Sequence, residues 1–115
     1  MHAIIETRSY LAAADAAGMG EVERTNVASL VGSDPIVGQL MVGTGGCRKF
    51  RFRKPSTGKS GGYRIVSFYD GEDIPVVLLT VFGKGEKDNL TKAERNALAR
   101  MVKDLAVELR KKGTQ

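Results

Sequence analysis

In one hexapeptide in the middle of the chain, RKFRFR, cationic and aromatic side chains alternate from Lys49 to Arg53. Successive side chains of a β-strand point to opposite faces of its sheet. Phe50 and Phe52 therefore share one face of the predicted strand. Lys49, Arg51 and Arg53 share the other face. The pattern predicts a half-buried strand with an aromatic core face and a cationic solvent face.

Two further strands follow this one. The segment PSTGKSGG is rich in turn-forming residues and predicts a hairpin that leads into a strand from Tyr63 to Tyr69. After a turn at residues 70–73, the run PVVLLTVF is continuously apolar and rich in β-branched residues. Such a run is typical of a central strand that is covered on both faces.

The N-terminal third predicts a short strand at residues 3–5 and two helices. Ser9 is a candidate N-cap and Gly18 a candidate C-cap of the first helix. The second helix covers residues 21–33, with Val22, Val27, Leu30 and Val31 as its apolar positions. It ends at Asp34-Pro35 because a residue before proline is pushed out of helical geometry. A glycine-rich loop is expected at residues 35–46.

The C-terminal segment predicts a long helix. Thr91 and Glu94 have the spacing of a capping box at its start. The apolar stripe comprises Leu90, Ala97, Leu98, Met101, Leu105 and Leu109. Together the elements predict one α+β domain over residues 1–115, an antiparallel sheet covered by helices.

The charge of the chain is unevenly distributed. The net charge is +5, but residues 35–69 carry seven Lys or Arg and no acidic residue. Residues 1–34 instead sum to −3. A one-sided basic surface attracts phosphate backbones or an acidic partner. A solvated basic face without a ligand is the alternative interpretation.

Several classes of protein are disfavoured. The first ten residues, MHAIIETRSY, lack the apolar run of a signal peptide. No apolar stretch approaches the roughly 20 residues of a membrane-spanning helix. The single cysteine, Cys47, fits a reducing cytosol and is expected to be a small buried residue. The single histidine, His2, cannot build a metal site with it, so no metal or cofactor is expected.

Three blocks of sequence resemble a known family. GTGGCRKFRF, then GGYRIVSFYD, then LLTVFGKGEKDNLT followed by a helix, resemble the HigB-type branch of the RelE/ParE toxins over roughly residues 36–112. The resemblance implies a RelE-like fold, an antiparallel sheet with two N-terminal helices and a C-terminal helix packed on it. It implies a cytoplasmic toxin of a type II toxin–antitoxin pair, a metal-independent endoribonuclease that cuts mRNA in the ribosomal A site. The implied partners are the 70S ribosome, its mRNA and a HigA-like helix-turn-helix antitoxin, which links the complex to operator DNA.

The resemblance also suggests site residues. Arg64, in GGYR, matches the family's strand arginine beside the scissile phosphate. Lys49, Arg51 and Arg53 fall at the family's basic strand cluster, and Lys84 and Lys87 at the end of the next strand. The expected catalytic residues are Arg64, Lys49, Arg51, Lys84 and Lys87. The expected RNA-binding residues are Arg48, Arg53, Lys54 and Lys59.

Cleavage of RNA without a metal uses the neighbouring 2′-OH as nucleophile, and it needs a base, an acid and cations at the phosphate. Arg suits the cationic role because it is planar, permanently charged and bidentate toward phosphate. RelE carries a further Arg and a catalytic Tyr where this chain has Gly85 and a residue near Thr91. The neighbouring candidates for acid and base are Lys84, Glu86, Lys87 and Asp88.

Two other functions share the same sequence features. A ParE-like inhibitor of DNA gyrase has the same fold, although it needs no phosphate clamp. A basic nucleic-acid-binding module without catalysis is the third reading. Tyr63 and Tyr69 flank the basic strand, where packing against the sheet is expected in preference to base stacking.

Overall fold

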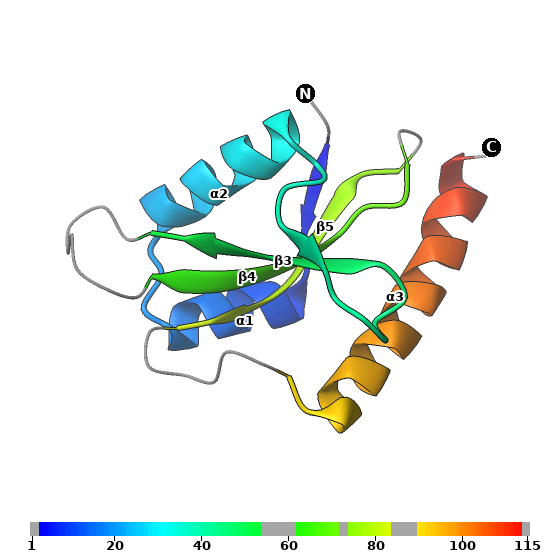
Figure 1. The fold of residues 1–115 in the computed structure, drawn as a ribbon. Coiled ribbons are helices and arrows are strands. Elements are labelled where there is room, and N and C mark those ends of the chain that lie inside the picture. The colour runs from blue at the N-terminus through cyan, green and yellow to red at the C-terminus, as the bar shows by residue number, and fades with distance from the viewer. Residues whose placement is uncertain (1–2, 54–61, 72–73, 84–89, 114–115) are drawn as a thin grey trace.

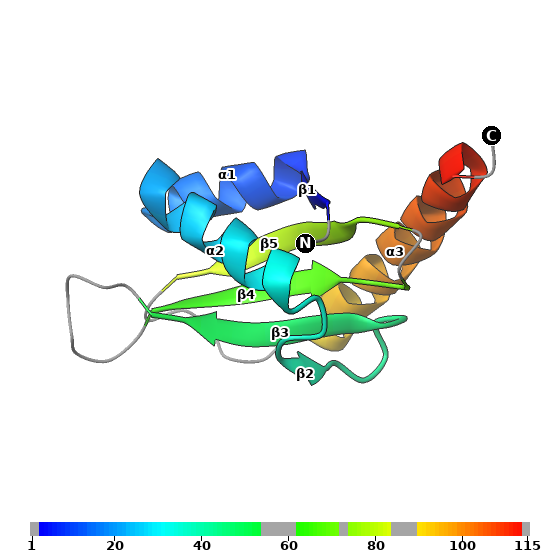
Figure 2. The same cartoon turned by 90° about the horizontal axis from the view of Figure 1, so that it is seen from above.

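The computed structural model describes residues 3–53, 62–71, 74–83 and 90–113. Its elements are β1 (Ile4–Glu6), α1 (Arg8–Ala16), α2 (Glu21–Ser33), β2 (Gln39–Leu40), β3 (Cys47–Phe52), β4 (Tyr63–Phe68), β5 (Val76–Phe82) and α3 (Lys92–Gly113). The strands form one sheet in the order β1-β5-β4-β3-β2. α1 and α2 cover one face of this sheet, and α3 lies against the other (Figures 1 and 2). The expected α+β class with helices on a sheet is confirmed.

The sheet is antiparallel from β2 to β5, as the sequence predicts. β1 differs, because it joins the edge of β5 in parallel. A parallel neighbour requires a long crossover, and α1 and α2 both lie within the chain that separates these two strands. The N-terminal strand thereby tethers both helices to the face that they cover.

β5 is an interior strand between β1 and β4, and it is buried on both faces. Val76, Leu78 and Val81 pack under α1 and α2, whereas Val77 and Leu79 pack under α3. An irregularity in the pairing with β4 shifts the register beyond Val66, and Thr80 pairs with Val66. The prediction of a strand covered on both sides is confirmed.

The segment expected to be a loop contains the short edge strand β2. Gln39 and Leu40 pair with Lys49 and Arg48 of β3. Gly38, with φ of 95°, permits this approach, because a side chain there would overlap with the carbonyl group of Lys49. The glycine-rich composition gave no sign of this strand, because it forms only through pairing with β3.

The first helix begins earlier than expected. Its N-cap is Thr7, whose Oγ1 accepts a hydrogen bond from the Tyr10 amide at 3.1 Å, so the prediction of Ser9 as N-cap was wrong. The Thr7 hydroxyl also donates to the Leu78 carbonyl at 2.8 Å, and Ser9 donates to Leu79 at 2.8 Å. Thr7 is the N-cap because its hydroxyl bonds both to the first turn of α1 and to β5.

The second helix has the expected bounds, Glu21–Ser33, and Asp34 is its C-cap. Val27 and Val31 are buried, but Val22 is 74% exposed and does not belong to the core stripe. At its start, the Gly20 amide donates to Glu23 Oε1 at 2.9 Å. An acidic side chain near a helix N-terminus is also favoured by the helix dipole.

The capping box of α3 is confirmed. The Thr91 amide donates to Glu94 Oε1 at 2.8 Å, and the Glu94 amide donates to Thr91 Oγ1 at 3.1 Å. Leu98 of the predicted stripe is buried, together with Val102 and Ala106, which the prediction left out. Ala97 is exposed, contrary to the prediction. No helix of the described residues is both long and apolar enough to cross a membrane.

Candidate nucleic-acid interface

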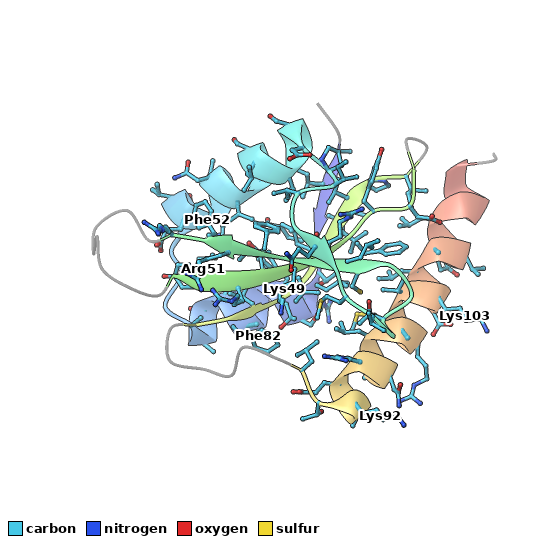
Figure 3. All side chains as sticks on the ribbon, in the orientation of Figure 1. Lys49, Arg51, Phe52, Phe82, Lys92 and Lys103 are labelled. Carbon is cyan, nitrogen blue, oxygen red and sulfur yellow. The ribbon has the colours of Figure 1, made fainter. Side chains whose placement is uncertain are left out.

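The strand register brings three predicted site residues onto one face of the sheet. Arg51 of β3 lies opposite Arg64 of β4, and Lys49 lies opposite Val66. Val66 packs under α3, as does Cys47 at the start of β3. Because side chains alternate along a strand, Lys49, Arg51 and Arg64 project on the α3 side. We call these three residues the cationic cluster; Figure 3 labels two of them, Lys49 and Arg51.

The aromatic side of β3 faces the other way, as predicted. Phe50 is buried under α1 and α2, and Phe52 packs against the same core. Arg51 is exposed, whereas Lys49 and Arg64 are half-buried. The cluster is therefore displayed by a strand whose opposite side is anchored in the protein interior.

The remaining predicted residues do not join the cationic cluster. Arg48 lies on the opposite face of β3, where its Nη1 donates to the carbonyl oxygens of Ile36 at 3.1 Å and Gly38 at 3.2 Å. These bonds hold the segment that leads into β2. Arg53 follows the end of β3 and is exposed. The predicted hairpin turn and the predicted site residues Lys54, Lys59, Lys84 and Lys87 lie outside the described residues.

Charge is sorted between the two sides of the molecule. The helices that cover the far face carry the acidic residues Asp15, Glu21 and Glu23. α2 also carries Arg24, whose Nη1 lies 4.0 Å from Oε2 of Glu6 in β1. The cationic cluster is on the other side of the sheet, so the uneven charge of the sequence becomes a difference between faces. A phosphate backbone that approached the α3 side would meet cations and avoid the acidic layer.

Other candidate residues have structural roles. Tyr63 is 2% exposed, packs in the core under α1 and α2, and donates its hydroxyl to the Gly18 carbonyl oxygen at 3.3 Å. Tyr69 packs against the same core. The interpretation of both as packing residues is confirmed.

Cys47 is fully buried, as expected. Burial raises the pKa of its thiol to about 11, although the hydrogen bond with Thr44 acts in the opposite direction. A neutral, inaccessible thiol is a poor nucleophile. Among the described residues, no group of three or more His, Cys, Asp or Glu could hold a metal ion.

Sequence reasoning missed a cavity that adjoins the cationic cluster. The cavity has a volume of about 240 Å³ and lies between the end of β5 and the first turns of α3. Phe82 lines it and pairs with Arg64 across the sheet, while Thr80 lines it and pairs with Val66. The period-two pattern could place Phe82 on a strand, but only the packing of α3 creates the hollow beside it.

The strand order, the helical layers and the C-terminal helix together define the RelE-like fold. The chain is similar to the solved structure of a mutant of the Escherichia coli toxin RelE, with two arginines replaced by alanine, in the free state. The two are 21% identical, with a TM-score of 0.53 over 88% of this chain and 96% of that one. No model of a protein family matches the chain.

Proposed function

We propose that the protein is the toxin of a type II toxin–antitoxin pair, a ribosome-dependent endonuclease that cuts mRNA in the A site. The observation that carries the proposal is the pairing of Arg51 with Arg64 on the same face as Lys49. The similarity in fold to a toxin, RelE, supports it. The HigB-like sequence blocks support a proposed assignment to the HigB-type branch of these toxins.

In the proposed reaction, the 2′-OH attacks the adjacent phosphorus in line and expels the 5′-oxygen. The products are a 2′,3′-cyclic phosphate and a 5′-hydroxyl, and no metal is required. Arg51 and Arg64 hold the phosphate oxygens, on which negative charge grows in the transition state. Cations fixed in advance stabilise that charge more effectively than water does. Lys49 adds a third positive charge on the same face of β3, two residues before Arg51.

The anchoring of β3 makes the cluster suitable for this work. Phe50 is 7% exposed in the core on the far side of the strand, so the backbone that carries Lys49 and Arg51 is held in place. Preorganisation of this kind limits the rearrangement that a phosphate must induce. Arg53, Lys54 and Lys59 are proposed to contact RNA backbone, with Lys84 and Lys87 near the reacting groups. Arg48 is not included, because its guanidinium bonds to the carbonyls of Ile36 and Gly38 on the opposite face.

The proposed partners follow from the same reading. A HigA-like antitoxin binds and silences the toxin in the cytoplasm, and the complex binds operator DNA through the antitoxin. Expression of this chain alone in a sensitive host should arrest growth, and co-expression of the adjacent antitoxin gene should restore it. Normal growth with abundant soluble toxin would contradict this part of the proposal.

The nuclease is tested by mapping new 5′ ends on a reporter mRNA in a translating extract. We expect ends within translated codons, and an Arg51→Ala or Arg64→Ala variant should reduce their rate of appearance about 100-fold or more, as removal of a transition-state donor does. Arg8→Ala is the matched control, because it removes one exposed arginine from α1 on the acidic side. Intact mRNA together with trapped gyrase–DNA breaks would assign the protein to the ParE-like inhibitors. Tight RNA binding without cleavage would assign it to the non-catalytic modules.

A further inference from the structure

The cavity beside the cationic cluster is open to one side and mainly apolar. Its lining comes from the start of α1, the end of β5 and the first turns of α3: Ser9, Leu79, Thr80, Phe82, Leu90, Glu94, Ala97, Leu98 and Met101. β1 pairs with β5 only as far as Leu78, so the cavity lies along the part of β5 beyond that pairing. It is therefore a hollow between elements and does not interrupt the core.

The cavity and the cationic cluster are neighbours by register. Phe82 lies opposite Arg64, which lies opposite Arg51. Adjacent strands are about 4.8 Å apart, so these three side chains form one row across the α3 face of the sheet. Figure 3 labels the two ends of the row, Arg51 and Phe82.

The cationic cluster and the cavity differ in chemistry, and each suits a different part of a nucleotide. Phosphate is an anion that suits Arg51 and Arg64. The cavity instead offers apolar surface and one carboxylate, Glu94, which is fixed at the start of α3 because its Oε1 accepts a hydrogen bond from the Thr91 amide at 2.8 Å. That carboxylate repels phosphate and leaves a neutral, flat group as the favoured occupant.

We propose that the cavity is a nucleobase-binding subsite, which holds a base next to the phosphate that the cationic cluster grips. This inference rests on the proposed nuclease function and extends it to recognition of the substrate. The Phe82 ring supplies a stacking surface, and Met101 closes the apolar side from α3. The hydroxyls of Ser9 and Thr80 and the Glu94 carboxylate are the polar groups at which the edge of a base can be read.

Such a subsite couples the identity of one base to cleavage. Stacking on an aromatic side chain contributes to binding for every base, whereas hydrogen bonds at the edge distinguish one base from another. Occupation of the cavity also fixes the nucleotide on both sides of its sugar. The phosphate is then presented to Arg51 and Arg64 in one orientation.

The experiment fills the cavity from an exposed position. Ala97 lines the cavity and is exposed, so Ala97→Trp places an indole in the hollow without replacing a buried residue. Ala93→Trp is the matched control, since Ala93 is exposed on the same helix one turn earlier and does not line the cavity. Phe82→Leu is a second variant, which removes the stacking surface and keeps an apolar side chain.

Each variant is assayed on a reporter mRNA with translating ribosomes, and the 5′ ends are sorted by codon. We expect Ala97→Trp and Phe82→Leu to cut the preferred codons about fivefold or more slowly, the effect of losing one stacked base. The base bias at one codon position should also be lost. Ala93→Trp should match the wild type in rate and bias.

The outcomes separate this inference from the function on which it rests. If Ala97→Trp and Phe82→Leu cleave mRNA with the rate and base bias of the wild type, the base subsite is refuted and the proposed nuclease function is unaffected. Loss of antitoxin binding in Ala97→Trp, with normal cleavage, would also overturn it and assign the cavity to a protein side chain. A wild-type protein that cuts no mRNA would refute the proposed function itself, and the subsite with it.

Discussion

Arg51 and Arg64 lie directly opposite each other on β3 and β4, on the face of the sheet that α3 partly covers. Like charges at opposing positions of an antiparallel pair are destabilising, by about 0.2–1 kcal/mol on the scale of cross-strand pairs. Stability alone would favour a β-branched residue or an opposite charge at one of the two positions. A bound phosphate between the two guanidinium groups reverses the sign of this interaction.

The first prediction separates stability from activity at this pair. Arg51→Thr should leave the free energy of unfolding unchanged or raise it by up to ~1 kcal/mol, since threonine suits a strand and the repulsion between the two arginines is removed. The same variant should lose mRNA cleavage. Urea unfolding and the mapping of 5′ ends measure the two effects.

The control for this variant is Arg53→Thr, which removes the same charge just beyond the end of β3. An equal stabilisation in both variants would indicate an effect of net charge and would contradict a role for the pairing. The affinity of wild-type protein for RNA should also fall with salt, and the slope should shrink by about one unit in Arg51→Thr.

Sequence patterns predicted those features that depend mainly on residues close together in the chain. RKFRFR was sufficient to place Phe50 and Lys49 on opposite faces, and the Thr91–Glu94 spacing was sufficient to start α3. β2 was missed because its two residues become a strand only through pairing with β3. The first N-cap was misplaced because Thr7 also bonds to the carbonyl of Leu78, a residue far along the chain.

The same distinction between local and long-range features applies to the candidate site. The face to which a side chain points follows from alternation along the strand, so the joint position of Lys49 and Arg51 was predictable from the sequence. The position of Arg48 was predictable too, but its bonds to the carbonyls of Ile36 and Gly38 depend on the path of a loop. The cavity depends on how α3 docks against β5, for which the sequence holds no local signal.

A second prediction concerns the hydroxyl of Tyr63. It donates to the Gly18 carbonyl oxygen at 3.3 Å and lies 3.4 Å from Glu23 Oε1, so it ties β4 to the turn between α1 and α2. Tyr63→Phe should lower the free energy of unfolding by about 0.5–1.5 kcal/mol, the usual net contribution of such a bond. Cleavage of mRNA should be unchanged. A loss of cleavage with unaltered stability would instead give the phenol a role in catalysis.

A third prediction concerns the glycine that admits β2. Gly38 has φ of 95°, and a side chain there would collide with the Lys49 carbonyl group. Gly38→Ala should therefore be destabilising by more than the ~1–3 kcal/mol that a strained backbone alone costs. Gly43→Ala is the matched control, since Gly43 has φ of 78° and open space around it.

The difference between these two variants measures the cost of the collision. We also expect Gly38→Ala to weaken RNA cleavage, because displacement of β2 disturbs the strand that carries Lys49. Equal unfolding free energies for the two variants, measured in urea, would show that β2 does not need the close approach. Full activity in Gly38→Ala would show that β2 does not position Lys49.

A fourth prediction concerns the reactivity of Cys47. Its side chain is fully buried, and its amide donates to Thr44 Oγ1 at 3.1 Å. A thiol reagent at pH 8 should therefore fail to modify the native protein within the time in which it modifies the protein in urea. Rapid modification of native protein would show that the start of β3 opens readily, and the cationic cluster would then lack its rigid support.

The same thiol makes the stability depend on pH. Burial raises its pKa from 9.0 to about 11. The folded state therefore keeps its proton at pH values where the unfolded state has lost it, so the stabilisation is complete below pH 9 and disappears as the pH rises toward 11. Tyr10, whose pKa burial raises to about 12, adds a similar decline in stability at higher pH.

Cys47→Ala should remove only the part of this decline in stability that is due to the thiol. The free energy of unfolding, measured in urea from pH 7 to 10.5, should fall less steeply for Cys47→Ala than for the wild type, by up to ~1.4 kcal/mol per pH unit. Parallel profiles would mean that the thiol is hydrated in the folded protein.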